Sequence, residues 1–397
     1  SASQDSDFLA ARKAFQAGNS KLLAEYADRL TDHALVPYVD YYQLRSILRT
    51  TDISNIRNFL LRHEGTLVAD RLRSDWLKIL GKNQQWQFFD AEYPLLVNKD
   101  TELSCYVYQR WLNAKDKEVL QAIRDVWLTA NNMPESCTPV FNSLIASGQI
   151  SVEDIWTRIR LALEEGQTTL AKQVSRYLPG NETLNITELS AADKNPLRYL
   201  DAQKNQAKTR SDREIILFAL LRLLRNDTNQ AYAHWLKVKG KFNENDRSYF
   251  LARLGHRSAL RHDSRALDWF MEAQKVKKPY PLTDTLLAWQ ARAALRVLNW
   301  NIVLKSIEGM SVAEQQVDTW RYWKARALKE QGKIQDANTI FAPLSAEHTF
   351  YGQLAKEELG TVLSVMDETY RVSNNEVSAM EKRPAVQRTL AFSRMDL

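Results

Sequence analysis

Two amphipathic helical segments joined by a single glycine recur in three distant parts of the chain, around Gly18, Gly166 and Gly332. In each, a small or apolar residue stands seven positions before the glycine, and an apolar residue stands five positions after it. The residues at these positions are Ala11, Ile159 and Ala325 before the glycine, and Leu23, Ala171 and Ala337 after it. Because glycine readily takes the left-handed backbone that ends a helix, each segment predicts a helical hairpin.

Two further segments keep the helical spacing without a central glycine. Residues 284–310 place Asn299 near the expected turn, and Asn is the next best residue for left-handed backbone. Residues 249–275 carry Ala266 and Phe270 where Ala337 and Phe341 stand in the third hairpin. The spacing loosely resembles that of tetratricopeptide repeats. Since one hairpin cannot bury its own apolar face, we predict an all-α fold in which short helical hairpins stack into a superhelix.

The composition agrees with a folded helical chain. Only 12 Gly and 10 Pro occur in 397 residues, which is few for a sheet with many hairpin turns. Hydrophobic residues make up 44% and charged residues 26%, so the chain can bury a core and is not of the disordered class. No run of about 18 apolar residues occurs, and no transmembrane segment is expected.

Boundaries are weakly marked. Residues 179–213 are the most polar stretch, and an internal boundary is expected there. After Pro384 an amphipathic helix is predicted to begin, and it is cut by the end of the chain. The first residues lack an initiator Met and an apolar targeting segment, as in a mature chain after signal removal or in a cloned fragment.

The usual markers of enzyme chemistry do not occur. None of the six His forms HExxH or another spacing that places two metal ligands on one helix face. No G-x-S-x-G elbow, phosphate-binding loop or dinucleotide fingerprint is found. We therefore predict no metal, no cofactor and no catalytic residue in this sequence.

The two cysteines, Cys105 and Cys137, are the whole supply. In an oxidising compartment they are a candidate disulfide, and in a reducing one they would be two buried thiols. No His lies near enough to complete a zinc site with them. The residues alone do not decide between a disulfide and two buried thiols.

The net charge of +6 is concentrated in one segment, because 11 basic and five acidic residues lie between His234 and Lys278. Such a patch would attract an anionic polymer, although a solvated helix face would have the same composition. The candidate ligand-binding residues in it are Lys237, Lys239, Lys241, Arg247, Arg253, Arg257 and Arg261. We expect the Lys and Arg of 237–265 to line the interior of the superhelix.

Most of the 11 Trp are expected in the core, where each buries on the order of 200 Å². Trp320 and Trp323 share one helix face at a spacing of three, and we interpret both as core. Tyr322 points elsewhere on that helix and is a further candidate for ligand contact.

Several stretches of the sequence are distinctive, namely "LVPYVDYYQL", "ELSCYVYQRW", "VWLTANNMPESC", "RIRLALEEG" and "VDTWRYWKARALKEQGKIQDA", the last followed closely by "HTFYGQLAKEELG". These stretches resemble the soluble lytic murein transglycosylases. They occur in the order that the family has them and cover most of residues 8–365. The resemblance implies a right-handed, ring-like superhelix, followed by a linker domain and a lysozyme-like catalytic domain.

The resemblance also implies domain bounds, a cellular compartment and a pairing of the two cysteines. Residues 1–360 would form the superhelix, and 361–397 would begin a truncated linker domain. The family is periplasmic, so signal removal, association with the cell wall or outer membrane, and a Cys105–Cys137 disulfide are implied. Peptidoglycan glycan strands are the implied partner, together with proteins that build or remodel the cell wall.

The family's catalytic domain uses a Glu-Ser pair, with the Glu as general acid and base in forming 1,6-anhydro products, and this sequence departs from that pattern. Its only Glu-Ser pair, Glu135 and Ser136, lacks the Gly-Leu-Met-Gln and Tyr-Asn-Ala-Gly companion segments. We therefore predict the non-catalytic superhelical portion of such an enzyme, which holds or orients glycan strands.

Two other functions are compatible with this sequence. The alternative is a freestanding helical-repeat adaptor that binds a periplasmic protein partner in its concave face. Nucleic-acid binding through the basic segment ranks behind both, because that segment has no interleaved aromatic residues and no reading motif.

Overall fold

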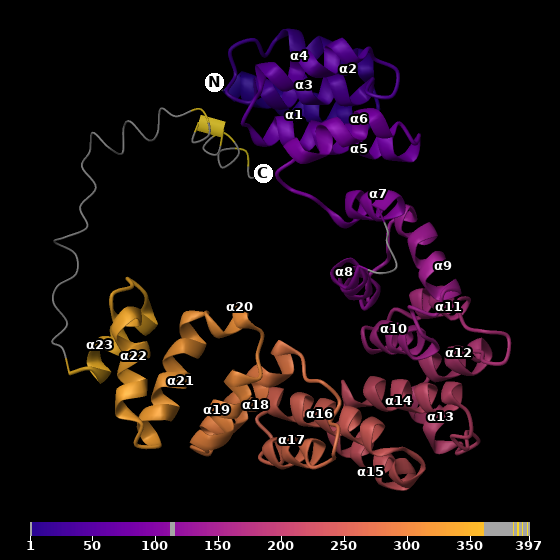
Figure 1. The fold of residues 1–397 in the computed structure, drawn as a ribbon, viewed down its shortest axis with the longest axis vertical. Helices are drawn as coiled ribbons and strands as arrows, with labels where there is room; N and C mark the ends of the chain where they lie inside the picture. Colours follow the sequence, from indigo (N-terminus) through magenta and orange to yellow (C-terminus); the bar gives the residue numbers. More distant parts are fainter. Residues whose placement is uncertain are drawn as a thin grey trace. The chain divides into compact units, whose positions relative to one another are not determined.

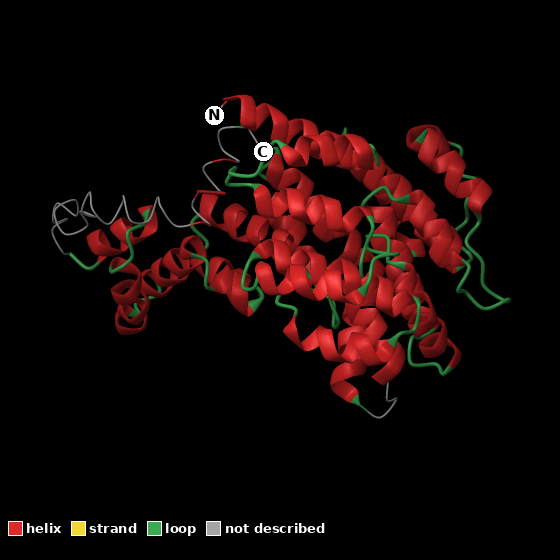
Figure 2. Cartoon of the chain, turned by 90° about the horizontal axis from the view of Figure 1, so that it is seen from above, coloured by secondary structure: helices red, strands yellow, loops and turns green. Residues whose placement is uncertain are grey.

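The computed structural model describes residues 2–111 and 116–360, together with Pro384, Gln387, Arg388, Ala391 and Met395. These described residues form helices, turns and loops, and no strand occurs among them (Figures 1 and 2). The predicted all-α fold is therefore confirmed. No described helix has both the length and the apolar character needed to cross a membrane.

Contacts divide the chain into two compact units, which are unit 1 (Ser1–Asp154 with Tyr370–Leu397) and unit 2 (Ile155–Thr369). The expected internal boundary near 179–213 falls inside unit 2. Most of the expected linker segment, 361–397, lies outside the described residues, so the predicted domain bounds stay predictions.

Unit 1 is built from short helices. They are α1 (Ala2–Gln16), α2 (Ser20–Asp28), α3 (Val36–Ser46), α4 (Ile53–Arg62), α5 (Leu67–Lys82), α6 (Trp86–Glu92), α7 (Thr101–Trp111), α8 (Lys117–Trp127) and α9 (Thr138–Ala146), with 3₁₀ turns η1 (Tyr93–Leu95) and η2 (Glu135–Cys137). A disulfide joins Cys105 of α7 to Cys137 of η2, with 4.9 Å between their Cα atoms. Both cysteines are buried, so the bond ties these two elements together inside unit 1.

Unit 2 continues the pattern after α10 (Val152–Glu164), which crosses the boundary between the units. Its helices are α11 (Thr168–Ser175), α12 (Ile186–Lys194), α13 (Pro196–Asp201), α14 (Arg210–Leu224), α15 (Thr228–Val238), α16 (Glu244–Leu260), α17 (Ala266–Gln274), α18 (Asp284–Arg296), α19 (Trp300–Glu308), α20 (Val312–Gln315), α21 (Asp318–Glu330), α22 (Ile334–Ser345) and α23 (Phe350–Glu358), with the 3₁₀ turn η3 (Lys239–Lys241).

Within unit 2, α14, α16 and α18 pack one beside the next, and each forms a hairpin with the helix that follows it. In Figure 1, α14 and α16 lie next to each other, and their hairpin partners α15 and α17 lie below them. Neighbouring hairpins in this row thus pack against one another, as the repeat pattern predicted.

The predicted glycine turns are confirmed. Gly18, Gly166 and Gly332 have φ of 69°, 73° and 80°, in the left-handed region. The residues seven positions before them, Ala11, Ile159 and Ala325, are completely buried. Leu23, Ala171 and Ala337, five positions after the glycines, are also buried. All six positions therefore belong to the core, as the repeated spacing predicted.

The expectation for Asn299 is corrected. The left-handed residue of that hairpin is Leu298, with φ 55°. Asn299 instead starts α19, where its side chain accepts a hydrogen bond from the backbone N–H of Ile302. Asn is as well suited to this N-cap as to the turn, and the cap satisfies a backbone donor that the helix leaves unpaired. In the α16–α17 hairpin the left-handed residue is His262, with φ 57°.

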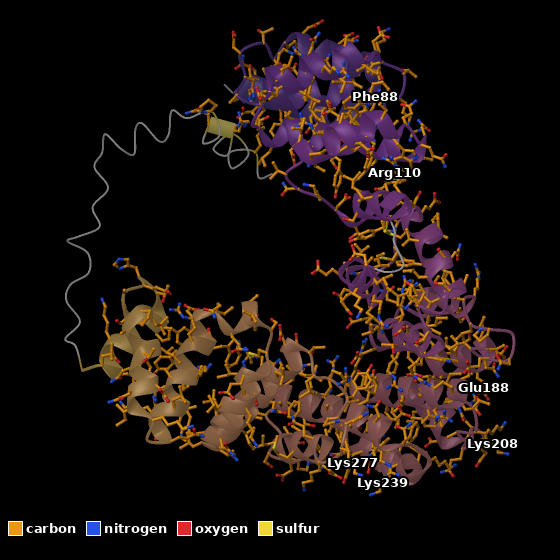
Figure 3. All side chains as sticks on the ribbon, viewed as in Figure 1. Phe88, Arg110, Glu188, Lys208, Lys239 and Lys277 are labelled. Carbon is orange, nitrogen blue, oxygen red and sulfur yellow. A yellow bond between two sulfur atoms is a disulfide. The ribbon has the colours of Figure 1, made fainter. Side chains whose placement is uncertain are left out.

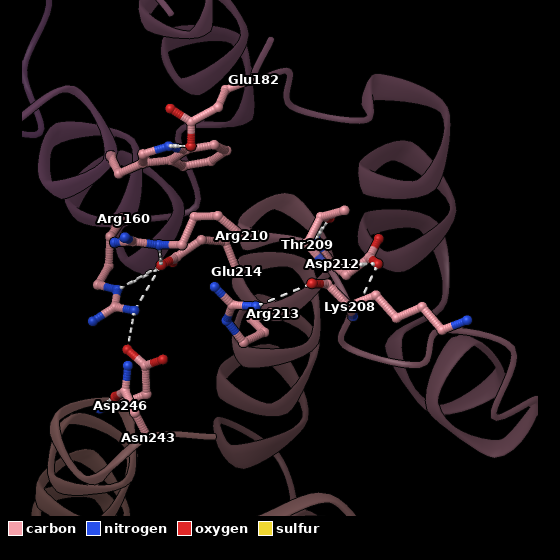
Figure 4. Close-up of polar contacts among 11 residues, drawn as sticks. Arg160, Glu182, Lys208, Thr209, Arg210, Asp212, Arg213, Glu214, Asn243 and Asp246 are labelled. Atoms are coloured by element: carbon pink, nitrogen blue, oxygen red, sulfur yellow. Dashed lines mark hydrogen bonds and ion pairs between the residues drawn. The ribbon is translucent and has the colours of Figure 1, made fainter. Parts of the chain in front are cut away.

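A buried ionic network joins the first three long helices of unit 2 (Figure 4). Arg160 of α10 donates through Nη2 to Glu214 Oε1 of α14 at 2.6 Å and to Asp246 Oδ1 of α16 at 2.7 Å. Arg210 donates through Nε to the same Glu214 Oε1 at 2.8 Å. Arg160, Glu214 and Asp246 are each about 95% buried or more. Each charge therefore depends on its partners, because water is not available to replace them.

The network extends to a second arginine on α16. Arg253 pairs with Glu164 of α10, and its guanidinium lies 4.0 Å from the centroid of the Tyr249 ring. The Arg160 guanidinium lies over the same ring at 4.5 Å. Three guanidinium groups (Arg160, Arg210, Arg253) thus face three carboxylates (Glu164, Glu214, Asp246), so the buried charges balance.

Burial alone would raise the pKa of Glu214, but the Arg160 and Arg210 charges outweigh it and hold that pKa below its ordinary value. The carboxylate therefore stays ionised at neutral pH. It stabilises the fold above the ordinary glutamate pKa, and this contribution is lost as the pH falls through the lowered value.

The turn geometry predicts opposite effects at two equivalent positions. Gly332→Ala should destabilise the protein by about 1 kcal/mol, because alanine is strained at φ 80° although no atom lies within 4 Å of the added Cβ. Leu298→Gly should stabilise it by up to about 1 kcal/mol, since leucine is strained there and is 66% exposed. Urea denaturation of both variants checks this, and a change of the same sign in both would contradict it.

The ionic network predicts a large cost for a small change. Glu214→Gln should reduce the free energy of unfolding by about 3–5 kcal/mol, because it leaves Arg160 and Arg210 without their shared charge. The control is Glu330→Gln, which removes a more exposed partner of Arg326 and should cost less than about 1 kcal/mol. The deficit of the Glu214 variant should shrink as the pH falls below the ordinary glutamate pKa, because the carboxyl then protonates in the unfolded wild-type chain before it does in the folded one. Equal losses in the two variants would show that the network is dispensable.

Candidate functional site

One cavity of about 280 Å³ opens beside the ionic network, between α10, α14, α16 and the start of α18. We call it the arginine cavity. Its lining consists of Glu164, Glu165, Leu221, Leu224, Arg225, Arg253, His256, Arg257, Thr283, Thr285 and Leu286. The leucines form an apolar wall. The arginines provide positive charges, the glutamates provide negative charges, and the threonines provide hydroxyl groups.

The three arginines of this cavity differ in how far the protein satisfies them. Arg253 is paired with Glu164, and Arg225 donates through Nη2 to the main-chain oxygen of Glu164 at 2.9 Å. Arg257 forms no hydrogen bond or ion pair with any described residue. Burial and the nearby Arg225 and Arg261 charges lower its pKa. The guanidinium of Arg257 therefore has donors that a ligand can use.

His256 lies one position before Arg257 and also lines the arginine cavity. Burial, together with the Arg257 and Arg253 charges, lowers its pKa to about 4, so the imidazole is neutral at pH 7. A neutral imidazole offers one donor and one acceptor. The His256 ring lies 6.3 Å, centroid to centroid, from the Trp289 ring of α18.

Trp289 belongs to a second cavity of about 590 Å³, the tryptophan cavity, which is more apolar. Its lining consists of Ala259, His262, Asp263, Ser264, Ala266, Leu267, Trp289, Arg292, Ala293, Arg296 and Val297. The guanidinium of Arg292 lies over two rings, 4.6 Å from the Trp289 centroid and 5.4 Å from that of Trp320. The exposed Arg292 forms no hydrogen bond or ion pair with any described residue.

The two cavities are neighbours on α16 and α18, because His256 of one contacts Trp289 of the other. Together they present a guanidinium with unused donors, a neutral imidazole, carboxylates and a half-buried indole face. Guanidinium groups bind carboxylates through paired hydrogen bonds, and indole rings pack against the apolar faces of flat ligands. The arrangement thus combines groups that can hydrogen-bond a carboxylate with a ring that can pack against an apolar face.

General acid catalysis at neutral pH needs a carboxyl group whose pKa is raised. Among the described residues, every carboxyl group with a resolved pKa shift, namely Glu214, Asp263 and Glu358, has its pKa lowered by nearby cations or hydrogen bonds. Glu135 is exposed in the 3₁₀ turn η2, and the hydroxyl of the adjacent Ser136 donates to the main-chain oxygen of Glu102. None of these three carboxyl groups therefore has the raised pKa that such an acid needs.

The structure separates the basic residues that the sequence suggested as ligand contacts. Lys237, Lys239 and Lys241 are exposed near the end of α15, and Lys241 Nζ lies 3.2 Å from Gln206 Oε1. In Figure 3, Lys239 and Lys277 lie at the edge of unit 2 formed by α15 and α17. This is the side opposite α14 and α16.

The arginines of that set are mostly bonded to the protein itself. Arg247 donates to the main-chain oxygens of Lys239 and Phe242, and Arg261 donates to those of Leu224 and Arg225. Arg253 is buried in the ionic network. Lys237 and Lys241 line a separate, smaller cavity of about 140 Å³. Of the seven basic candidates, Arg253 and Arg257 line the arginine cavity, and of these two only Arg257 forms no hydrogen bond or ion pair with a described residue.

The aromatic cluster at the start of α21 belongs to the packing of unit 2. Trp320 is buried, as expected, whereas Trp323 is half-buried. Tyr322 is 4% exposed, and its ring packs against those of Trp323, Phe341 and Tyr351. Its hydroxyl donates to Glu358 Oε1 at 3.3 Å. The Tyr322 ring is therefore not available to a ligand in this structure.

Sequence reasoning did not single out Arg225, His256, Trp289 or Arg292. A signal was present, because Arg253, His256 and Arg257 recur at spacings of three and four along α16, and Trp289 and Arg292 are three apart on α18. The sequence does not show that the face of α16 with Arg253, His256 and Arg257 lies next to the face of α18 with Trp289 and Arg292.

No family model matches the chain. The soluble lytic murein transglycosylase of Escherichia coli K12 is 22% identical over 382 residues, which cover 90% of this chain and 55% of that protein. The protein of the same name from Salmonella typhimurium is 24% identical over 353 residues, which cover 83% of this chain and 51% of that protein.

Two solved structures share the fold. An inactive mutant of lytic transglycosylase Slt from Pseudomonas aeruginosa is similar with a TM-score of 0.59 and 22% identity, over 98% of this chain and 63% of that one. The complex of a 70-kDa soluble lytic transglycosylase with bulgecin A is similar with a TM-score of 0.50 and 21% identity, over 99% and 63%.

The chain thus spans about half of the length of the curated relatives that it matches. The sequence matches extend across both units, and the structural matches share their helical architecture. The predicted resemblance is confirmed: over most of its length, the chain is homologous to the non-catalytic helical part of the soluble lytic murein transglycosylases.

Proposed function

We propose that this chain is the helical portion of a periplasmic lytic transglycosylase that cleaves peptidoglycan to 1,6-anhydro products, and that it holds the glycan strands. Homology to proteins named murein transglycosylases supports the substrate class. The Cys105–Cys137 disulfide is compatible with an oxidising compartment such as the periplasm. Cell-wall synthesis or remodelling proteins remain proposed partners on the same grounds.

The observation that carries the glycan-holding role is the pair of adjoining cavities on α16 and α18. A glycan offers apolar ring faces, hydroxyl and amide groups, and in murein also carboxylates. The indole of Trp289 can pack against a sugar face, and the unused donors of Arg257 and Arg292 can bind oxygen atoms. Each chemical feature of the strand therefore has a matching group in the two cavities.

We assign no catalytic role to the described residues. The reaction would need an acid with a raised pKa, and each resolved carboxyl shift is in the opposite direction. In this proposal, the helical hairpins position the strand and bond cleavage is performed by other parts of the enzyme.

The proposal predicts binding to peptidoglycan without cleavage. The purified chain should cosediment with sacculi, and muropeptide analysis should show no 1,6-anhydro products above the level of untreated sacculi. Trp289→Ala should weaken binding roughly two- to tenfold, because it removes the half-buried indole ring that lines the tryptophan cavity. Trp300→Ala is the matched control, since Trp300 is also half-buried but lies beside Trp323 and lines neither cavity.

Circular dichroism must show that both variants remain folded. Failure of the wild-type chain to bind sacculi would overturn the proposed function. Equal weakening by the two substitutions would exclude the tryptophan cavity as the binding surface, and release of anhydro products would contradict the non-catalytic role.

A further inference from the structure

The arginine cavity contains a cation that the fold itself does not satisfy. Arg253 is neutralised by Glu164, and Arg225 is anchored on a main-chain oxygen. Arg257 forms no hydrogen bond or ion pair with any described residue, and burial together with the Arg225 and Arg261 charges outweighs the attraction of Glu165 and Glu164 and lowers its pKa. Like charges held together in a partly buried place repel one another, and a bound anion would relieve that repulsion.

The other groups of the cavity restrict which anion fits. Glu164 and Glu165 lie on the same lining, so a highly charged ligand such as a phosphate polymer would be repelled there. A singly charged carboxylate meets less repulsion. The glutamates, His256 and Thr285 can in turn bond to hydroxyl or amide groups close to that carboxylate.

The size and surroundings of the cavity also favour a small ligand with one carboxylate. Its volume of about 280 Å³ is that of a small organic group, and Leu221, Leu224 and Leu286 give it an apolar wall. The half-buried indole of Trp289 lies next to His256 at the rim. A carboxylate at Arg257 would therefore be attached to a group that packs toward this ring.

We infer that the arginine cavity is a carboxylate-binding subsite, in which Arg257 with Arg225 binds the acid group of an acid-bearing sugar. This inference rests on the proposed function and deepens it. It gives the helical portion a selectivity of its own: strands that carry free carboxylates are held, and strands whose carboxylates have been neutralised are not.

The test compares two pairs of probes on the full chain. The first pair is purified glycan strands with free carboxylates and the same strands after amidation of those groups. The second pair is N-acetylmuramic acid and N-acetylglucosamine, which differ by the acid-bearing lactyl ether. Binding is measured by cosedimentation or pull-down for strands and by NMR or Trp fluorescence titration for the sugars.

The variants are Arg257→Gln and Arg257→Lys, with Lys277→Gln as the control for loss of one positive charge. Lys277 is exposed and lies at the α15–α17 edge, away from the cavity lining (Figure 3). Arg257→Gln should weaken binding of the carboxylate probes about tenfold or more, and Arg257→Lys should recover only part of it, because lysine cannot bind a carboxylate in the paired manner. Lys277→Gln should change binding less than about twofold.

The outcomes separate the two proposals. Preference for carboxylate probes that is lost in Arg257→Gln supports the subsite. Equal binding of free and amidated strands, unaffected by Arg257→Gln, overturns the subsite and leaves glycan holding intact. Binding of N-acetylmuramic acid at Arg257 without binding of strands supports the subsite but overturns the proposed function. No binding of any probe overturns both.

Discussion

The buried network of Arg160, Glu214 and Asp246 fixes how the first long helices of unit 2 lie against one another. Its charges come from α10, α14 and α16, and each is out of reach of bulk water. Apolar faces alone allow helices to slide with little change in buried area, whereas a guanidinium between two carboxylates is satisfied in one register. The arginine cavity is bordered by the same three helices, so its shape depends on that register.

Arg253 connects this structural role with the candidate function. It pairs with Glu164, stacks on Tyr249 and also lines the cavity. Arg257, one helical turn further along α16, lacks such partners. The two arginines look alike in the sequence, and only the surroundings of each guanidinium distinguish the cation that holds the fold together from the cation that is available to a ligand.

The hairpin fold could be predicted from the sequence because its signals are local. At Gly332 the glycine predicts the turn, and Ala325, seven positions earlier, predicts a buried position in the helix before it. Where two local preferences compete, prediction failed: Asn299 suits a left-handed turn and an N-cap, and the structure uses it as the cap. The candidate site was predicted only at Arg253 and Arg257, because a partner such as Trp289 comes from another helix and their adjacency is a property of packing.

The ionic network also affects how unit 2 should come apart. In a stack of hairpins, stability is the sum of the repeats and of their nearest-neighbour interfaces, so such proteins can lose structure gradually from an end. A single charge cluster shared by α10, α14 and α16 couples two consecutive interfaces, since loosening either one exposes the same charges. We therefore expect this part of unit 2 to unfold as one cooperative block, whereas hairpins outside it, such as α21 and α22, would unfold independently.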